Sequence, residues 1–218
     1  MEDIVFGLVS FILAAGAFGF GAAKLFKKKK PMYFQLIVCA AGCFAIEQLS
    51  VTVNIWCGVY DALSIGMLGI FGCNFFLLSA NYGTLDRIVD DGKGSKKARI
   101  LALIAPVIMA VLIGSVFTVW WGSNKTGAVM WTVMLIPALF ASYFNLKHLL
   151  LPMDPYEFLR ATKPCNIAAL VFCIVTAAYA IMLPLGSNVI SGTISIAASA
   201  SMLLLAIFSV KGAKKWGI

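Results

Sequence analysis

Long apolar runs separated by short charged segments dominate the chain. Seven such runs cover residues 3–26, 32–56, 62–82, 100–120, 128–150, 164–185 and 189–210. Each run has the roughly 20 residues that an α-helix needs to cross a hydrocarbon core. Short alternating segments, which are typical of a membrane β-barrel, are missing from the sequence. The pattern therefore predicts an all-α polytopic integral membrane protein with seven transmembrane helices, whose main partner is the lipid bilayer.

The composition agrees with a membrane protein. Hydrophobic residues make up 61% of the chain and charged residues only 12%, whereas a soluble domain carries about 25% charged residues. The formal net charge of +8 raises the question of nucleic-acid binding. The cations lie between the apolar runs, however, and no segment is long enough to fold into a soluble basic surface. We therefore expect no nucleic-acid partner.

The positive charges predict the orientation. If the segment after the first run faces the cytoplasm, alternation of the seven runs places 16 of the 17 Lys and Arg residues on that side, and only Lys125 on the other. Cytoplasmic loops carry such an excess. The prediction is an outside N-terminus and an inside C-terminus, in the plasma (cytoplasmic) membrane. No positive segment precedes the first run, so we expect no cleavable signal peptide.

A weak internal repeat divides the single predicted transmembrane domain, residues 1–218. Lys30-Pro31 opens the second run and Lys163-Pro164 opens the sixth. This position predicts two three-helix halves, residues 1–97 and 126–218, joined by the fourth span as a linker. The layout is similar to that of the SWEET sugar transporters in topology alone.

A polar stripe follows one face of the second run. Its members are spaced by three or four residues, which places them on one side of a helix: Gln35, Cys39, Cys43, Glu47, Ser50 and Asn54. Glu47 is the acidic residue that lies deep inside an apolar run. Because a carboxyl group in hydrocarbon is costly, it should face other helices or water and mark an ion or ligand pathway. The alternative is a protonated structural carboxyl that bonds to a neighbouring helix.

Polar residues in other runs predict the rest of a polar cavity. Besides Glu47, the candidates for a ligand or proton pathway are Gln35, Asn54, Asn74, Tyr143, Asn145, Tyr179, Ser195 and Ser199. Serine and asparagine also pack well between membrane helices, so ordinary interhelical bonding is the alternative.

Small residues and prolines predict how the helices pack. Ala15, Gly19 and Ala23 form one stripe, and a glycine stripe, Gly66–Gly69–Gly72, forms another; both favour close helix contact. Pro106 and Pro137 fall inside the fourth and fifth runs and should bend them.

The usual catalytic signatures are missing. The one histidine, His148, is predicted to lie at the membrane interface, and no set of His and Asp ligands accompanies it. The six cysteines are expected to be free and buried, although Cys39 and Cys43 would suit a soft metal. A retinal protein needs a lysine within the last run, which has none before Lys211. We expect no cofactor and no metal, and the missing signatures disfavour an enzyme without excluding one.

Three functions remain open. The first is a small-solute transporter or channel-like protein with a polar cavity among its helices, coupled to protons through Glu47. The alternative is a membrane-embedded sensor or accessory subunit that acts through a partner protein. The third is an intramembrane lipid-modifying enzyme. The sequence leaves open a homo-oligomer or a membrane-protein partner.

Overall fold

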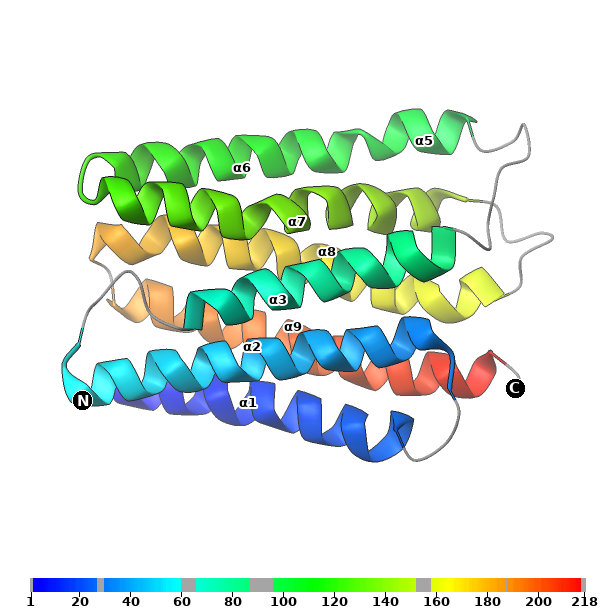
Figure 1. Cartoon of the computed structure of the whole chain (residues 1–218), viewed down its shortest axis with the longest axis horizontal. Helices are drawn as coiled ribbons and strands as arrows, with labels where there is room; N and C mark the ends of the chain where they lie inside the picture. Colours follow the sequence, from blue (N-terminus) through cyan, green and yellow to red (C-terminus); the bar gives the residue numbers. More distant parts are fainter. Residues whose placement is uncertain are drawn as a thin grey trace.

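The computed structural model describes residues 2–26, 30–59, 66–86, 96–151, 158–186 and 188–216. In these ranges every regular element is a helix (Figure 1): α1 Glu2–Leu25, α2 Met32–Cys57, α3 Gly66–Ser79, η1 Ala80–Leu85, α5 Lys96–Ala102, α6 Ile104–Trp121, α7 Lys125–Leu150, α8 Phe158–Met182, η3 Leu183–Leu185 and α9 Asn188–Lys215. Parts of the predicted basic loops, residues 27–29, 87–95 and 152–157, lie outside the described residues.

Six of the helical stretches are long and apolar enough to cross a membrane. They are Glu2–Leu25, Met32–Cys57, Lys96–Trp121, Lys125–Leu150, Leu159–Leu185 and Val189–Lys215. The prediction of a helical membrane protein is therefore confirmed. The remaining predicted span corresponds to α3, which has 14 residues and continues into the six-residue π-helix η1.

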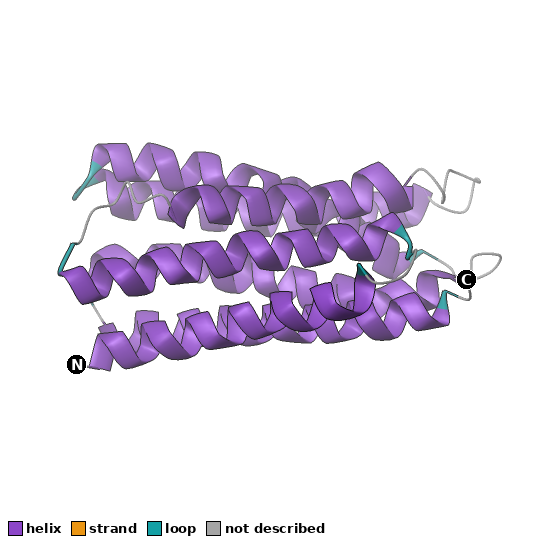
Figure 2. Cartoon of the chain, turned by 60° about the horizontal axis from the view of Figure 1, so that its bottom comes forward, coloured by secondary structure: helices purple, strands orange, loops and turns teal. Residues whose placement is uncertain are grey.

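The helices run side by side as a bundle (Figure 1). Going round it, α1 packs on α2, α2 on α3, α3 on α7, α7 on α8, α8 on α9, and α9 on α1. Helix α6 lies outside this ring, against α7 and α8. The two chain ends lie at opposite ends of the bundle in both views (Figures 1 and 2). We call these the N-terminal end and the C-terminal end of the bundle.

Small residues allow close contact of α1 and α3 with their neighbours, but not always through the predicted stripes. On α1 the predicted stripe is wrong, because Gly19 is exposed and faces open space. The buried face of α1 is rotated away from it and consists of Gly7, Ser10, Ala14, Ala17, Gly21 and Leu25. On α3 the stripe is confirmed at Gly69, where an added Cβ would lie 2.6 Å from the carbonyl oxygen of Cys43.

The prolines act differently from one another. Pro106 cannot donate to the carbonyl of Ala102, and its ring crowds that group. A turn at Leu103 accordingly separates α5 from α6. Pro137 lies inside α7, which continues from Lys125 to Leu150.

Helix α8 begins at Phe158, six residues before the predicted start at Pro164. Leu159 and Ala161 of this added segment are buried. The carbonyl oxygen of Ala161 lies 2.7 Å from where a Cβ on Gly212 of α9 would be. Packing against α9 therefore stabilises helical structure that the proline by itself does not favour.

Candidate functional site

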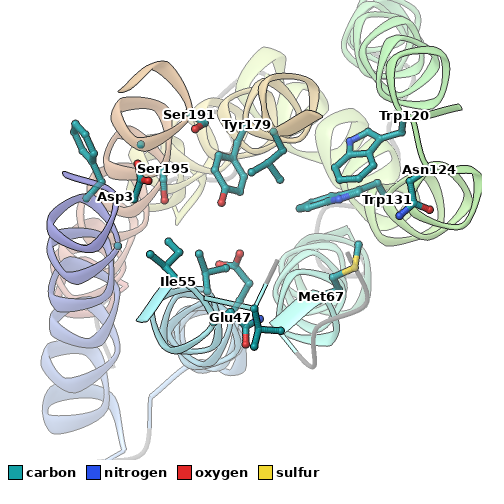
Figure 3. Close-up of a pocket in the computed structure, with 17 residues that line it drawn as sticks. Asp3, Glu47, Ile55, Met67, Trp120, Asn124, Trp131, Tyr179, Ser191 and Ser195 are labelled. Carbon is teal, nitrogen blue, oxygen red and sulfur yellow. The ribbon is translucent and has the colours of Figure 1, made fainter. Parts of the chain in front are cut away.

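A pocket of about 380 Å³ opens at the N-terminal end of the bundle. Residues of α1, α2, α3, α6, α7, α8, η3 and α9 line it, together with Val59 after α2 and Asn124 in the turn between α6 and α7. Figure 3 shows the side chains around the space. Its polar lining comprises Asp3, Glu47, Asn54, Asn124, Ser191 and Ser195, besides the aromatic residues described below. The volume is at the lower end of the 300–1,000 Å³ that is typical of ligand pockets.

Glu47 lies deep in this pocket. It is ten residues before the end of α2 at Cys57, which at 1.5 Å per residue is about 15 Å along the helix. The residue is only 2% exposed. Gln48 Nε2 donates a hydrogen bond to Glu47 Oε2 at 2.5 Å. Gln48 Oε1 in turn accepts one from Ser195 Oγ at 3.1 Å, so a hydrogen-bonded chain holds the carboxyl group and ties α2 to α9.

Three aromatic side chains form the wall opposite Glu47. Trp131 and Tyr179 are 5% and 7% exposed, and their rings lie nearly perpendicular at a centroid distance of 6.4 Å. Trp120 lies 6.4 Å from Trp131 and is tilted by 32° from it. Figure 3 shows Glu47 and Tyr179 pointing toward the same space from opposite sides. Trp120 Nε1 donates to the carbonyl oxygen of Ala180 at 2.8 Å, which fixes the indole between α6 and α8.

Aromatic packing fills the core between the pocket and the C-terminal end. Phe44, about one helical turn from Glu47, meets Phe172 of α8 at 5.0 Å with perpendicular rings, and both are buried. Closer to the C-terminal end, Tyr33 Oη donates to Asn166 Oδ1 at 2.9 Å. The pocket is thus reached from one end of the bundle, and packed side chains separate it from the other.

Of the nine residues that the sequence nominates for a pathway, four line this pocket. They are Glu47, Asn54, Tyr179 and Ser195. Ser199, one turn further along α9, is fully buried, and its Oγ has no hydrogen-bond partner in the described part of the chain.

The other four nominated residues lie elsewhere. Gln35 is near the start of α2, where its Nε2 donates to the carbonyl oxygen of Lys30 at 3.0 Å. Asn74 Nδ2 donates across to the carbonyl of Met134 on α7 at 3.4 Å. The last two are Tyr143, whose ring packs edge-on against Phe144 at 5.0 Å, and Asn145, which belongs to the cluster described next.

A second polar cluster lies toward the C-terminal end, between η1 and α7. Lys147 Nζ lies 2.6 Å from Asp86 Oδ1, and His148 Nε2 lies 3.3 Å from the same oxygen. His148 Nδ1 lies 2.9 Å from Asn81 Oδ1, and Asn81 Nδ2 donates to Asn145 Oδ1 at 2.9 Å. His148 lies in the last turn of α7, near the end of its predicted span, and its side chain is fully buried between the helices.

This cluster also sets the charge state of Asp86. Burial by itself raises the pKa of the Asp86 carboxyl. The hydrogen bonds and positive charges of His148 and Lys147 outweigh burial, so that the pKa lies below its ordinary value of 3.8. Asn81 comes from the π-helical segment η1, and π-helical turns frequently occur at functional sites.

The sequence analysis did not nominate Gln48, Trp120 and Trp131 as pocket residues. Gln48 follows Glu47 directly, so it points about 100° away from the polar stripe and toward α9. An amide side chain directly after an acid inside an apolar run was the sequence signal that could have identified Gln48. For the two tryptophans, only the packing of the helices shows that they line the pocket.

The fold and this pocket define a helical membrane protein with a ligand-sized site at one end. Comparison with protein-family models, with curated proteins and with solved structures finds no match to the chain. Among the residues that the structure describes, no group of three or more His, Cys, Asp and Glu side chains could hold a metal ion.

Proposed function

We propose that the chain is a small-solute transporter or channel-like protein, with Glu47 as its proton- or ligand-binding group. The observation that carries this proposal is the position of Glu47: a buried carboxyl at depth in an open pocket of solute size. An acid inside a membrane-spanning helix is costly, and proteins retain one where it binds a substrate, an ion or a proton.

The proposal includes seven crossings, with the N-terminus outside and the C-terminus inside the plasma membrane. Chain ends at opposite ends of the bundle support an odd number of crossings. In the described part of the chain, Lys125 is at the N-terminal end, and the other Lys and Arg residues are at or near the C-terminal end. Cytoplasmic surfaces carry this excess of positive charge. An N-terminal epitope tag should therefore be accessible to antibody on intact cells, and a C-terminal tag only after permeabilisation.

Transport requires that the pocket open alternately to the two sides. The Phe44–Phe172 contact lies between Glu47 and the C-terminal end, so the structure corresponds to a state that is open to the outside under this proposal. Rocking of one group of helices against another would separate these rings and expose Glu47 to the inside. A proton carried by Glu47 would then be released on that side.

The test begins with the full chain in maltoside detergent. Ions, sugars, amino acids and amines are screened for an increase in melting temperature, because a ligand of the folded state stabilises it by mass action. Each hit is then offered as a radiolabelled solute to proteoliposomes, with and without a pH gradient. Uptake above that of empty liposomes supports transport.

Two variants make the result specific. Glu47→Gln should abolish uptake, whereas Glu2→Gln, the same chemical change at an exposed residue outside the pocket lining, should leave it intact. Uptake that survives Glu47→Gln would overturn the role of Glu47. Binding with no uptake under any gradient would overturn transport and favour a sensor or accessory subunit, which should then co-purify with a partner protein.

A further inference from the structure

The described lining of the pocket contains acidic side chains and no basic ones. Asp3 and Glu47 both line it, and no Lys, Arg or His is among the described lining residues. The chain as a whole has a formal net charge of +8, so this acidic lining runs against the overall balance. A cleft lined by one sign of charge within a low-dielectric surround attracts ligands of the opposite sign and repels those of the same sign. The lining therefore favours a cation over an anion or a zwitterion.

The aromatic wall is suited to the same kind of ligand. Trp131 stands between Trp120 and Tyr179, with both centroid distances at 6.4 Å and with rings at 32° and 78° to it. The negative faces of aromatic rings attract ammonium groups placed within about 6 Å. The indole N–H of Trp120 is already bonded to Ala180, so this side chain offers the pocket its ring surface rather than a donor.

The remaining lining decides between an inorganic and an organic cation. Val51, Ile55, Met67 and Leu183 contribute apolar surface. A metal ion would need several oxygen ligands around it, and no metal-binding group of three acidic, Cys or His residues occurs among the described residues. An alkylammonium fits better, because its charge can meet Glu47 and its carbon atoms can meet the apolar and aromatic walls.

The Glu47 carboxyl is also held in place before any ligand arrives. Gln48 donates to one of its oxygens and is itself fixed by Ser195. A carboxyl group that is already positioned loses little freedom on binding, which favours affinity. From these contacts we infer that the pocket binds a small organic cation, an ammonium or alkylated ammonium on an apolar body, with Glu47 as its counter-ion and Trp131 and Tyr179 as its cage. This inference rests on the proposed function and names the class of its substrate.

The first experiment compares ligands that differ in charge and share a shape. Choline and 3,3-dimethyl-1-butanol have the same shape, but only choline is charged. Phenethylamine and tetramethylammonium extend the cationic panel. With the full chain in maltoside detergent at neutral pH, one or more cations should raise the melting temperature, and the neutral alcohol should not. An equal shift with the neutral alcohol, or no shift with any of the cations, would overturn the inference without recourse to any variant.

Variants then test whether the ligand binds in this pocket. Glu47→Gln should abolish the cation-dependent shift, and Trp131→Leu should weaken binding about tenfold, the upper part of the range for a cation–π contact. Glu2→Gln is the matched control and should bind as the wild type does. If Glu47→Gln does not fold, Glu47→Asp keeps the charge on a shorter side chain and should bind more weakly than wild type. Unchanged binding in Glu47→Gln and Trp131→Leu would overturn the site.

The ammonium group can be a free solute or the headgroup of a lipid. Dihexanoylphosphatidylcholine and free choline distinguish these sources, since stabilisation by the short lipid alone identifies a headgroup. Cation binding without uptake into proteoliposomes would leave the ligand class intact and remove the transport proposal. Uptake of a neutral solute without cation binding would support transport and overturn the organic-cation inference. The two proposals can therefore fail independently of each other.

Discussion

Lys147 Nζ and Asp86 Oδ1 lie 2.6 Å apart, although the two residues are 61 positions apart in the chain. The ion pair joins the end of η1 to the last turn of α7, where the Lys147 side chain is only 6% exposed. Because few water molecules can reach this ammonium group, its interaction with Asp86 is screened less than that of a surface pair. The pair therefore fixes α3–η1 against α7 at the end of the bundle opposite the pocket.

Removing one partner of this ion pair should destabilise the protein. Asp86→Asn leaves the buried Lys147 ammonium without its counter-charge, and we expect the free energy of unfolding to fall by about 2–4 kcal/mol. Lys147→Met should also destabilise the protein. The double variant should lose less than the sum of the two, because the unpaired charge is then absent. SDS denaturation of the detergent-solubilised wild type, the two single variants and the double variant measures these losses. Strictly additive losses would mean that the two groups do not interact.

The same pair predicts how stability depends on pH. The pKa of Asp86 is lower in the folded protein than its ordinary value of 3.8. A carboxyl with a lowered folded pKa stabilises the fold above its unfolded pKa, and this contribution is lost as the pH falls through the folded pKa. The stability difference between wild type and Asp86→Asn should therefore shrink as the pH falls below about pH 4. Melting curves of both proteins across this range measure it, and a constant difference down to pH 3 would contradict the assignment.

Gly69 controls the distance between α2 and α3 beside the site. A Cβ at this position would lie 2.6 Å from the carbonyl oxygen of Cys43 and 2.8 Å from the Cβ of Glu47. Gly69→Ala must push the two helices apart, and we expect a loss of about 1–3 kcal/mol together with weaker ligand binding. Gly114→Ala is the matched control, because open space surrounds Gly114 on α6. There the higher helix propensity of alanine should leave stability unchanged or raise it by up to about 1 kcal/mol. Equal effects of the two substitutions would show that Gly69 has no special packing role.

Substitution of Gln48 should lower the stability of the protein more than substitution of its partner Ser195. Gln48→Met removes the donor to a buried carboxyl oxygen, which we expect to cost about 1–3 kcal/mol and to weaken ligand binding through Glu47. Ser195→Ala removes a single interhelical hydrogen bond, for which about 0.6 kcal/mol is typical in membranes. Thr193→Val on the exposed side of α9, whose hydroxyl bonds only within its own helix, is the control and should be neutral. A larger loss in Ser195→Ala than in Gln48→Met would contradict this order.

The helical membrane fold was predictable because the bilayer constrains the backbone so strongly. Inside hydrocarbon every peptide group must be hydrogen-bonded within the protein, and a continuous run of about 20 apolar residues achieves this as a helix. The six long helices overlap six of the predicted runs, and their ends differ from the prediction by a few residues where packing intervenes, as at Leu159 of α8. The remaining predicted run, 62–82, corresponds to the shorter helix α3, which continues as the π-helix η1.

The site was predictable only in part, because a linear sequence does not show how each helix is rotated or which helices are neighbours. By itself, the sequence determined that helices form, that they suit a membrane, and that Glu47 needs a polar partner or water. Only the tertiary structure decided that Gln48 is that partner, that Trp120 and Trp131 face the pocket, and that Asp86 and His148 meet in another cluster. The physical reason is that helix formation in a membrane depends on the length of a single apolar segment. These contacts depend instead on side-chain packing between segments that are far apart in the chain.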